Sequence, residues 1–545
     1  MVDVFERFPY LNRHISDFVS NGNPPPQFVE ELKDEHKKIT IPNLIYPIEQ
    51  NVFIHLDGLD NSGDSYPKYH IILPDPPSDN LFNAVEKIFA KKTSSQKPPD
   101  DKDERIKIIN NYLNETCIAT EQDVLYDEYS ENAFKKNKIQ VNQNDFESLQ
   151  YYFIRKRVGL DLLEPYLTDP YIEDITMIGT GKSYVVHKFF GPMRVTQQVT
   201  NDEIEDMLMA MAEQFGKTIS HARPIVDATL PDGSRINIVF GTDVSRKGTN
   251  LTIRRFAGVP MSITQLIKYG TIDSREAAYL WMMLNEGMSL FVCGETASGK
   301  TTSMTALTTF VPPTWKVVSI EDTPELALPH KNWVSEVTRD TGSDRSTITM
   351  QHLLKASLRQ RPNYIIVGEI RGAEASVAFQ AMQTGHPVIS TFHAATVSSL
   401  IQRLTNDPIK IPKTNIDNLN LALMQGAVQG PDGRLVRRVL SINEVVGYDS
   451  TVNNILFIPL FTWESSTDTV TYKGKGSSAL FANKILQARG LTKKNEGMLY
   501  EELETRANLL TELTNRKIYN YYEVFEHIAK VNEIGLDSYM REVLV

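Results

Sequence analysis

The chain has 545 residues, a formal net charge of −11 and 41% hydrophobic residues. This length predicts roughly two to four domains, and the acidic balance counts against a protein that coats DNA or RNA. The apolar runs are too short to cross a bilayer, the charged N-terminus is unlike a secretory signal, and Cys117 and Cys293 cannot build a disulfide framework or a four-ligand zinc site. We therefore expect a cytoplasmic protein with free thiols, no membrane span and no nucleic-acid partner.

Residues 1–104 are predicted to form a small N-terminal module, because Gly- and Pro-rich stretches interrupt short apolar segments. Asn51 to Leu56 and Tyr69 to Leu73 have the composition of strands, and Phe82 to Ala90 that of a helix. A polar tether at 91–104 follows. No recognisable chemistry is encoded in this part.

Residues 105–256 are predicted to form an α+β N-terminal domain. Residues 201–216 place five apolar side chains on one helical face, which predicts core packing: Ile204, Met207, Leu208, Met211 and Phe215. A hairpin pattern runs from 230 to 256, and an interdomain linker with Gly and Pro follows at 257–262.

Three arginines of that hairpin are candidates for function. Arg235 follows a Pro-Asp-Gly turn, and Arg254 and Arg255 end a strand in which apolar and polar residues alternate. A solvated strand face explains each of them as well as a functional site does. The residues alone leave both readings open.

Residues 263–545 are predicted to form the C-terminal domain, in which strands and helices alternate. This alternation is typical of a mostly parallel, doubly wound α/β sheet. A hairpin at 455–472 and a helical tail follow. The predicted elements are helices within 263–286, a strand at 290–293, a helix at 300–307, a strand at 316–320, a helix at 347–358, a strand at 363–368, a helix at 374–383 and a strand at 386–391.

The segment SLFVCGETASGKTTS at 289–303 joins a strand to a helix through a glycine loop. Its glycines allow backbone N–H groups to face a phosphate, Lys300 adds a positive charge, and Thr301 is placed to bind Mg²⁺. This predicts a site for ATP or GTP with Mg²⁺. The predicted nucleotide-binding residues are Gly294, Glu295, Thr296, Ala297, Ser298, Gly299, Lys300, Thr301 and Thr302.

Polar residues follow three of the predicted strands. Glu321 follows the strand at 316–320, Glu369 the strand at 363–368, and His393 the strand at 386–391. Ligands of open α/β sheets lie at the carboxyl ends of the strands, and nucleotide hydrolysis needs carboxylates to hold hydrated Mg²⁺ and to orient water. Acids at strand ends also cap helices, but three such ends favour a catalytic site.

Four motifs of the chain, taken together, resemble the ATPase family of type II and type IV secretion systems, type IV pili and the archaellum. The resemblance covers about Val158 to Gly447 and is greatest for archaeal members, judged from EPYLTDPYIEDI and LPDGSRINIVFG. It implies a RecA-like P-loop motor domain behind an N-terminal domain, assembled as a hexamer with ATP between the two domains. The motifs are GETASGKT at 294–301, SIEDTPEL at 319–326, IIVGEIRG at 365–372 and TGHPVISTFHA at 384–394.

The resemblance also implies what single residues do. Lys300 and Thr301 would hold phosphate and Mg²⁺, Glu369 would be the acid of the second Walker motif, and Glu321 would help to activate water. His393 would contact the γ-phosphate, and Arg235, Arg254 or Arg255 would reach the nucleotide from the N-terminal domain. The implied cofactors are ATP and Mg²⁺.

The implied partners are further copies of the chain in a homohexamer, a polytopic membrane platform protein and accessory cytoplasmic motor proteins. The protein would lie at the inner face of the cell membrane and drive assembly or rotation of a filament. Two other hypotheses stay open, a RecA-type nucleic-acid translocase and a nucleotide-dependent scaffold without turnover. The sequence also leaves open whether the filament is an archaellum or a pilus.

Overall fold

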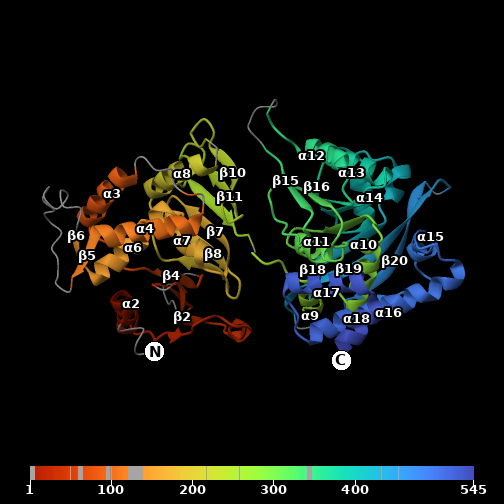
Figure 1. Cartoon of the computed structure of the whole chain (residues 1–545), viewed down its shortest axis with the longest axis horizontal. Coiled ribbons are helices and arrows are strands. Elements are labelled where there is room, and N and C mark those ends of the chain that lie inside the picture. The colour runs from red at the N-terminus through yellow and green to blue at the C-terminus, as the bar shows by residue number, and fades with distance from the viewer. Residues whose placement is uncertain are drawn as a thin grey trace. The chain divides into compact units, whose positions relative to one another are not determined.

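The computed structural model describes residues 7–49, 51–58, 65–93, 99, 101–120, 139–215, 218–256, 258–339, 346–430, 433–451 and 453–544. The chain divides into two compact units, Met1–Phe256 (unit 1) and Ala257–Val545 (unit 2) (Figure 1). Of the expected tether, residues 94–98 and 100 lie outside the described residues, and so does residue 257 of the expected linker.

Unit 1 is built on a ten-stranded sheet in the order β1-β2-β3-β4-β9-β8-β7-β12-β11-β10. The two strands predicted near its N-terminus are confirmed as β3 and β4, and the predicted hairpin as antiparallel β11 and β12. The strands are β1 Gln27–Phe28, β2 Asn43–Glu49, β3 Val52–Asp57, β4 Lys68–Ile72, β7 Ile172–Ile178, β8 Lys182–His187, β9 Gly191–Val195, β10 Ile225–Thr229, β11 Arg235–Val239 and β12 Asn250–Arg254.

The boundary expected at residue 104 runs through this sheet. Strands from both sides of it meet where β4 pairs in parallel with β9, with Lys68 opposite Arg194. Tyr46 of β2 and Tyr69 of β4 are buried and donate to the Asp169 carboxylate at 2.7 Å each. Local sequence patterns do not predict this pairing, because it is set by packing between segments far apart in the chain.

The helices of unit 1 form its cores with the sheet and with one another. The methionine-bearing face of α8 is confirmed as core for Ile204, Met207, Leu208 and Met211, whereas the side chain of Phe215 lies outside the described part. A second core joins α3, α4 and α6 to the small parallel pair β5 and β6. The bounds are α2 Pro9–Ser20, α3 Asp79–Thr93, α4 Lys102–Thr116, β5 Cys117–Thr120, β6 Ile139–Asn142, α6 Gln143–Arg157, α7 Glu164–Thr168 and α8 Asn201–Phe215.

Unit 2 is built on a nine-stranded sheet in the order β15-β14-β16-β17-β13-β18-β19-β20-β21. The strands from β15 to β18 in this order are parallel, and β18 to β21 are antiparallel. The strands are β13 Leu290–Gly294, β14 Val317–Glu321, β15 Trp333–Val337, β16 Tyr364–Ile370, β17 Val388–Phe392, β18 Leu421–Gln429, β19 Leu435–Asp449, β20 Asn454–Glu464 and β21 Thr469–Tyr472.

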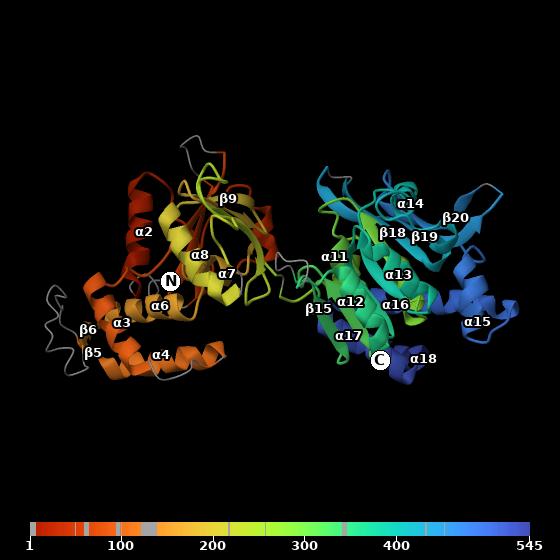
Figure 2. The same ribbon diagram turned by 90° about the horizontal axis from the view of Figure 1, so that it is seen from above.

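Helices cover both faces of the unit 2 sheet (Figure 2). Along β13, Leu290 and Val292 belong to one core and Phe291 and Cys293 to the other, as the period of two in a strand requires. The mixed α/β class is thereby confirmed, and both cysteines are buried and free. The helices are α9 Ile263–Lys268, α10 Ser274–Asn285, α11 Lys300–Thr308, α12 Met350–Ser357, α13 Glu374–Gln383, α14 Val397–Thr405, α15 Leu486–Ala488, α16 Glu496–Asn515, α17 Tyr521–Ile534 and α18 Leu536–Leu544.

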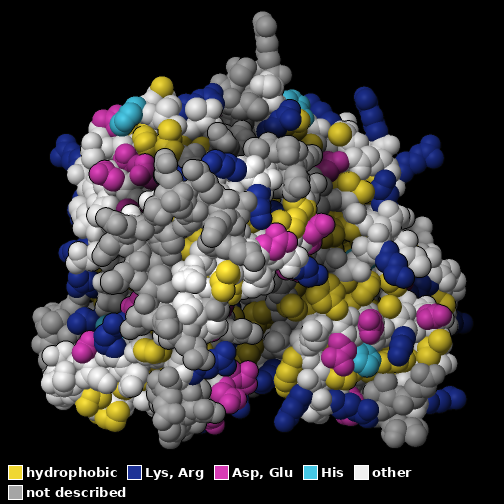
Figure 3. Space-filling view, turned by 60° about the vertical axis from the view of Figure 1, so that its left-hand side comes forward, with side chains coloured by type: hydrophobic (Ala, Val, Ile, Leu, Met, Phe, Trp, Pro, Cys, Tyr) yellow, Lys and Arg dark blue, Asp and Glu magenta, His cyan; other side chains and the backbone are white. Residues whose placement is uncertain are grey.

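The described surface carries both signs of charge. On the face shown in Figure 3, acidic and basic side chains are interspersed, with small apolar areas among them. None of the described helices is both long and apolar enough to span a bilayer.

Candidate nucleotide site

The phosphate loop predicted at 294–301 connects the central strand β13 to the first turn of α11. Gly294 ends β13, and a Cβ built there would lie 2.3 Å from the carbonyl oxygen of Gln425, so only glycine fits. Gly299 precedes α11 with φ +90, and Ala297 has φ +63. Lys300, Thr301 and Thr302 form the first turn of the helix, whose N-terminus favours an anion.

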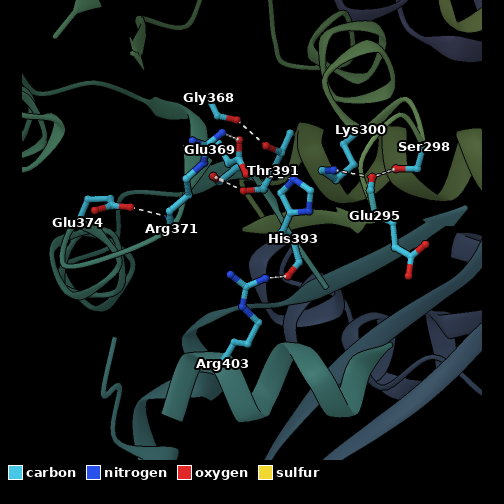
Figure 4. Close-up of polar contacts among 11 residues, drawn as sticks. Glu295, Ser298, Lys300, Gly368, Glu369, Arg371, Glu374, Thr391, His393 and Arg403 are labelled. Atoms are coloured by element: carbon cyan, nitrogen blue, oxygen red, sulfur yellow. Dashed lines mark hydrogen bonds and ion pairs between the residues drawn. The ribbon is translucent and has the colours of Figure 1, made fainter. Parts of the chain in front are cut away.

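Side chains of the loop itself bind one of its carbonyl oxygens. Lys300 Nζ and Ser298 Oγ each donate to the carbonyl oxygen of Glu295 at 2.8 Å (Figure 4). Burial lowers the pKa of Lys300, and the nearby Glu369 carboxylate opposes this shift. Lys300 is therefore a cation withdrawn from water, close to an acid and to the loop where phosphate is expected.

The strand ends predicted to supply acids and histidine lie beside the loop. Strands β14, β16 and β17 are consecutive neighbours, and β17 pairs with β13. Because all four strands are parallel, Glu321, Glu369 and His393 share the edge from which the phosphate loop emerges. The shared edge follows from the parallel direction of the strands, and the strand order decides which of these residues are neighbours.

Glu369 is positioned by a β-bulge. The register between β16 and β17 shifts at Gly368, so that Ile365, Val367 and Ile370 belong to one core despite their spacing. Thr391 Oγ1 donates to the carbonyl oxygen of Gly368 at 2.6 Å. The extra residue directs Glu369 away from that core.

The Glu369 carboxylate contacts two basic side chains at the site. Its Oε2 lies 2.5 Å from a terminal nitrogen of Arg371, and its Oε1 lies 3.5 Å from His393 Nε2 (Figure 4). Arg403 donates to the carbonyl oxygen of His393 and so holds its backbone. Burial and the charge of Lys300 lower the pKa of His393, which makes its neutral imidazole the dominant form at neutral pH.

Glu321 is 2% exposed and lies at the end of β14. Its Oε1 accepts the backbone N–H groups of Glu325 at 2.9 Å and Leu326 at 3.0 Å. Within the described residues, its Oε2 is buried without a hydrogen-bond partner. Burial raises the pKa of Glu321 to about 7. A carboxyl group whose pKa lies near 7, with one oxygen that accepts no hydrogen bond, can accept a proton from water.

The residues at this edge fit a hydrated Mg²⁺ ion. Thr301 would bind it through its hydroxyl and Glu369 through water, and Glu369 Oε1 is a buried oxygen without a hydrogen-bond partner in the described part of the chain. No group of three or more His, Cys, Asp or Glu side chains in the described residues could hold a metal ion by itself. Mg²⁺ keeps several waters and binds phosphate oxygens, so one or two protein ligands are enough to hold it.

The three candidate arginines lie in unit 1 and have different surroundings. Arg235 and Arg254 are directly opposite each other on β11 and β12 and are exposed. Arg235 lies 3.7 Å from Asp227, and Arg254 4.0 Å from Asp174. Arg255 instead donates to the carbonyl oxygen of Asp169, and burial lowers its pKa. Arg235 and Arg254 are accessible to a ligand, whereas Arg255 binds the backbone of Asp169 within unit 1.

The prediction missed three polar residues that contact the site. Arg371 follows Glu369 in the motif and could have been found there. Gln425 of β18 donates to the carbonyl oxygen of Ser298 at 2.9 Å, and Arg437 of β19 donates to that of Ala297 at 3.2 Å. Neither Gln425 nor Arg437 lies in a motif, so only the sheet topology reveals them.

Comparison with known proteins identifies the family. The sequence profile described as type II/IV secretion system protein matches residues 173–456, slightly more than half of the chain. The chain belongs to this family. An uncharacterized protein of Methanocaldococcus jannaschii is 43% identical over 548 residues, covering 98% of this chain and 97% of that protein. The resemblance to the family and its archaeal branch is thus confirmed.

Relatives of this secretion-family chain also include named proteins. Protein VirB11 of Agrobacterium fabrum is 30% identical over 266 residues, or 44% of this chain and 77% of that protein. The Legionella pneumophila ATPase DotB has 20% identity and a TM-score of 0.39, covering 54% of this chain and 82% of that one. The pilus retraction motor PilT with bound ADP has 19% identity and a TM-score of 0.40, covering 52% and 81%.

Proposed function

We propose that this chain is a secretion-type motor ATPase that hydrolyses ATP with Mg²⁺ in a RecA-like unit 2. The observation that carries the proposal is the convergence of the phosphate loop with three strand ends. The contact between Glu369 and His393 at 3.5 Å, and the effect of Glu369 on the pKa of Lys300, tie these parts together. A structural ion-pair network alone would not require an anion-binding loop at the same edge.

Each residue would have a separate task in hydrolysis. Lys300 would neutralise the β- and γ-phosphates, and Thr301 and Glu369 would hold hydrated Mg²⁺, which supplies charge neutralisation. Glu321 would orient the attacking water and accept its proton, because its pKa of about 7 lies near the working pH. His393, as a neutral imidazole, would donate a hydrogen bond to the γ-phosphate.

Residues of unit 1 would complete the site. Arg235 and Arg254 extend from one rung of the sheet and are exposed, and their charges match a triphosphate. Nucleotide bound by unit 2 would then attract this face of unit 1. The resulting closure would convert hydrolysis into movement.

The proposed assembly is a homohexamer that acts on a polytopic membrane platform protein and builds a pilus-like or archaellum filament. The support is family membership, since the matching profile is described as type II/IV secretion system protein. Accessory cytoplasmic proteins and a position at the inner face of the membrane belong to the same proposal. The formal net charge of −11 favours a protein partner over nucleic acid.

Phosphate release by the purified full chain tests the proposed hydrolysis. Lys300→Ala and Glu369→Ala should each lower kcat by at least about 100-fold, since one removes a phosphate contact and the other a Mg²⁺ ligand. Lys331→Ala and Glu501→Ala are matched controls, because both residues are exposed and lie outside the site. The controls should retain wild-type activity.

Three outcomes would contradict the proposal. Hydrolysis near the wild-type rate in both site variants would show that Lys300 and Glu369 do not form the catalytic site. An absence of ATP hydrolysis by the wild-type hexamer, with nucleotide binding intact, would favour a scaffold without turnover. Stimulation of hydrolysis by single-stranded DNA at low salt would instead favour a nucleic-acid translocase.

A further inference from the structure

Three carbonyl oxygens of the phosphate loop accept hydrogen bonds from side chains. The carbonyl oxygen of Glu295 is bound within the loop, as described above. Those of Ala297 and Ser298 are bound from outside, by Arg437 Nε and Gln425 Nε2. The two outer donors belong to β18 and β19, the antiparallel neighbours that lead away from the parallel part of the sheet.

Gln425 is built into the space behind the loop. It is 3% exposed and lies opposite Gly294 in the parallel pairing of β18 with β13. A Cβ built on Gly299 would lie 3.0 Å from Gln425 Nε2, so the amide packs directly against the loop backbone. A shift of register between β18 and β19 begins at Gln425, and such bulges redirect side chains.

Arg437 contacts the part of the loop with the least favourable backbone. Ala297 has φ +63, a conformation that residues with a Cβ rarely adopt. The carbonyl group bound by Arg437 belongs to this same residue. A Cβ built on Gly299 would also lie 3.3 Å from Arg437 Cδ, so the arginine stem lies along the loop. Arg437 is thus placed to stabilise the left-handed conformation of Ala297.

We propose that Gln425 and Arg437 form a carbonyl brace, a pair of positioning residues that keep the phosphate loop in its nucleotide-ready conformation. With carbonyl groups 297 and 298 held outward, the backbone N–H groups remain available to phosphate. Binding of a nucleotide then requires less rearrangement of the loop. The inference rests on the proposed function, in which this loop binds ATP.

The carbonyl brace also joins the nucleotide site to the antiparallel half of the sheet. Strand β19 runs from Leu435 to Asp449 and pairs with both β18 and β20. Displacement of β19 at Arg437 would release the carbonyl group of Ala297 and weaken nucleotide binding. By reciprocity, bound nucleotide would stabilise this position of β19.

A double-mutant cycle tests the carbonyl brace in the full-length protein. Arg437→Met should weaken the binding of a fluorescent ADP analogue about 5- to 10-fold and raise KM for ATP similarly, with kcat within about twofold, because ground-state binding is affected. Ala297→Gly removes the unfavourable side chain at φ +63. In that background, Arg437→Met should weaken binding by less than about twofold, and this non-additivity is the signature of the brace.

Arg438→Met is the matched control for the same strand. Arg438 pairs with Asp468 at 2.8 Å and donates to the carbonyl oxygen of Tyr269, and both of these partners lie outside the phosphate loop. Its substitution should lower the melting temperature and leave ADP affinity unchanged. Arg437→Lys keeps the charge but lacks the Nε donor, and should behave like Arg437→Met.

The outcomes separate the brace from the proposed function. If Arg437→Met weakens binding equally with Ala297 and with glycine at that position, or Arg437→Lys restores affinity, Arg437 acts by charge on the nucleotide and the brace is overturned. Crystal structures of nucleotide-free wild type and Arg437→Met decide the matter even if ADP does not bind. The brace predicts that Ala297 leaves positive φ in the variant, and an unchanged loop would overturn it.

Discussion

Asp169 in unit 1 and Glu321 in unit 2 are both buried carboxylates, and they differ in how many hydrogen bonds each oxygen accepts. Asp169 accepts hydrogen bonds from Tyr46, Tyr69 and the backbone N–H of Tyr171, so that both of its oxygens are bound. Glu321 accepts two backbone N–H groups on one oxygen, and in the described residues the other has no donor. Burial raises the pKa of both carboxyl groups.

This difference distinguishes a carboxylate that stabilises the fold from one available for chemistry. A buried acid with donors on both oxygens has most of its acceptor capacity used within the fold. A buried acid with an unbound oxygen carries a desolvation cost that a substrate or water can relieve. Asp169 joins β2 and β4 to the rest of unit 1, whereas Glu321 lies beside Gly368, next to Glu369 of the candidate site.

Glu321→Gln should have the largest effect, on catalysis. We expect kcat to fall about 100- to 1000-fold, because the amide cannot accept a proton from water. The melting temperature should remain within a few degrees of wild type, because the amide oxygen can still accept the two backbone N–H groups. Phosphate release and circular dichroism measure the two effects. Activity within tenfold of wild type would show that Glu321 is not needed to accept a proton from water.

Asp169→Ala should show the reverse behaviour. Its loss leaves the hydroxyl groups of Tyr46 and Tyr69 buried without their acceptor, which should lower the free energy of unfolding by about 2–4 kcal/mol. ATP hydrolysis per folded molecule should stay within about threefold of wild type. Urea denaturation followed by fluorescence measures the stability. Retention of wild-type stability would show that the satisfied carboxylate is dispensable.

A histidine cluster of unit 1 should make that unit sensitive to acid. His14 Nε2 lies 2.9 Å from His55 Nδ1, and His70 stacks on His55. Burial, reinforced by His70, lowers the pKa of His14 to about 4 and of His55 to about 3, while Asp57 opposes both shifts. The unfolded chain binds more protons between these values and about 6.5, so stability should fall as the pH decreases through this range.

The size of the acid effect can be measured against a variant. Unfolding of unit 1 should be easier by about 5 kcal/mol at pH 4.5 than at pH 7, because each of the two histidines contributes about 1.4 kcal/mol per pH unit below about 6.5. A His14→Met, His55→Met double variant should lose this dependence. Glu321 has the opposite effect on the stability of unit 2. Because burial raises its pKa from 4.5 to about 7, its contribution to stability declines as the pH rises through this range. An unchanged pH slope in the double variant would contradict the assignment.

Arg254, which ends β12, and Arg255, which follows it, should show the smallest effects. Arg255→Ala should lower the free energy of unfolding by about 1–2 kcal/mol, because it removes the donor to the Asp169 carbonyl group. Arg254→Ala should change stability by less than about 0.5 kcal/mol, since its ion pair is exposed, and should reduce kcat about tenfold. Denaturation and phosphate release of both variants give the result. A larger stability loss for Arg254→Ala than for Arg255→Ala would reverse their proposed tasks.

The sequence alone predicted the features that depend on residues close together in the chain. The strand, glycine loop and helix at 290–308 were predicted because glycine spacing and apolar runs act within one short segment. The strands before Glu321 and His393 were predicted for the same reason. These predictions located part of the site, because acids that follow parallel strands lie at one edge of the sheet whatever the order of the strands.

Only the tertiary structure decided which side chains meet. The order β14-β16-β17-β13 brings Glu369 to His393, and the bulge at Gly368 shifts the alternation along β16. The pairing of β4 with β9 merges the first hundred residues with the rest of unit 1. The same reason explains why Arg255 is half-buried while Arg254 is exposed. It also explains why Arg437 reaches the phosphate loop. Register and strand order are set by the burial of side chains far apart in the chain, which no local pattern records.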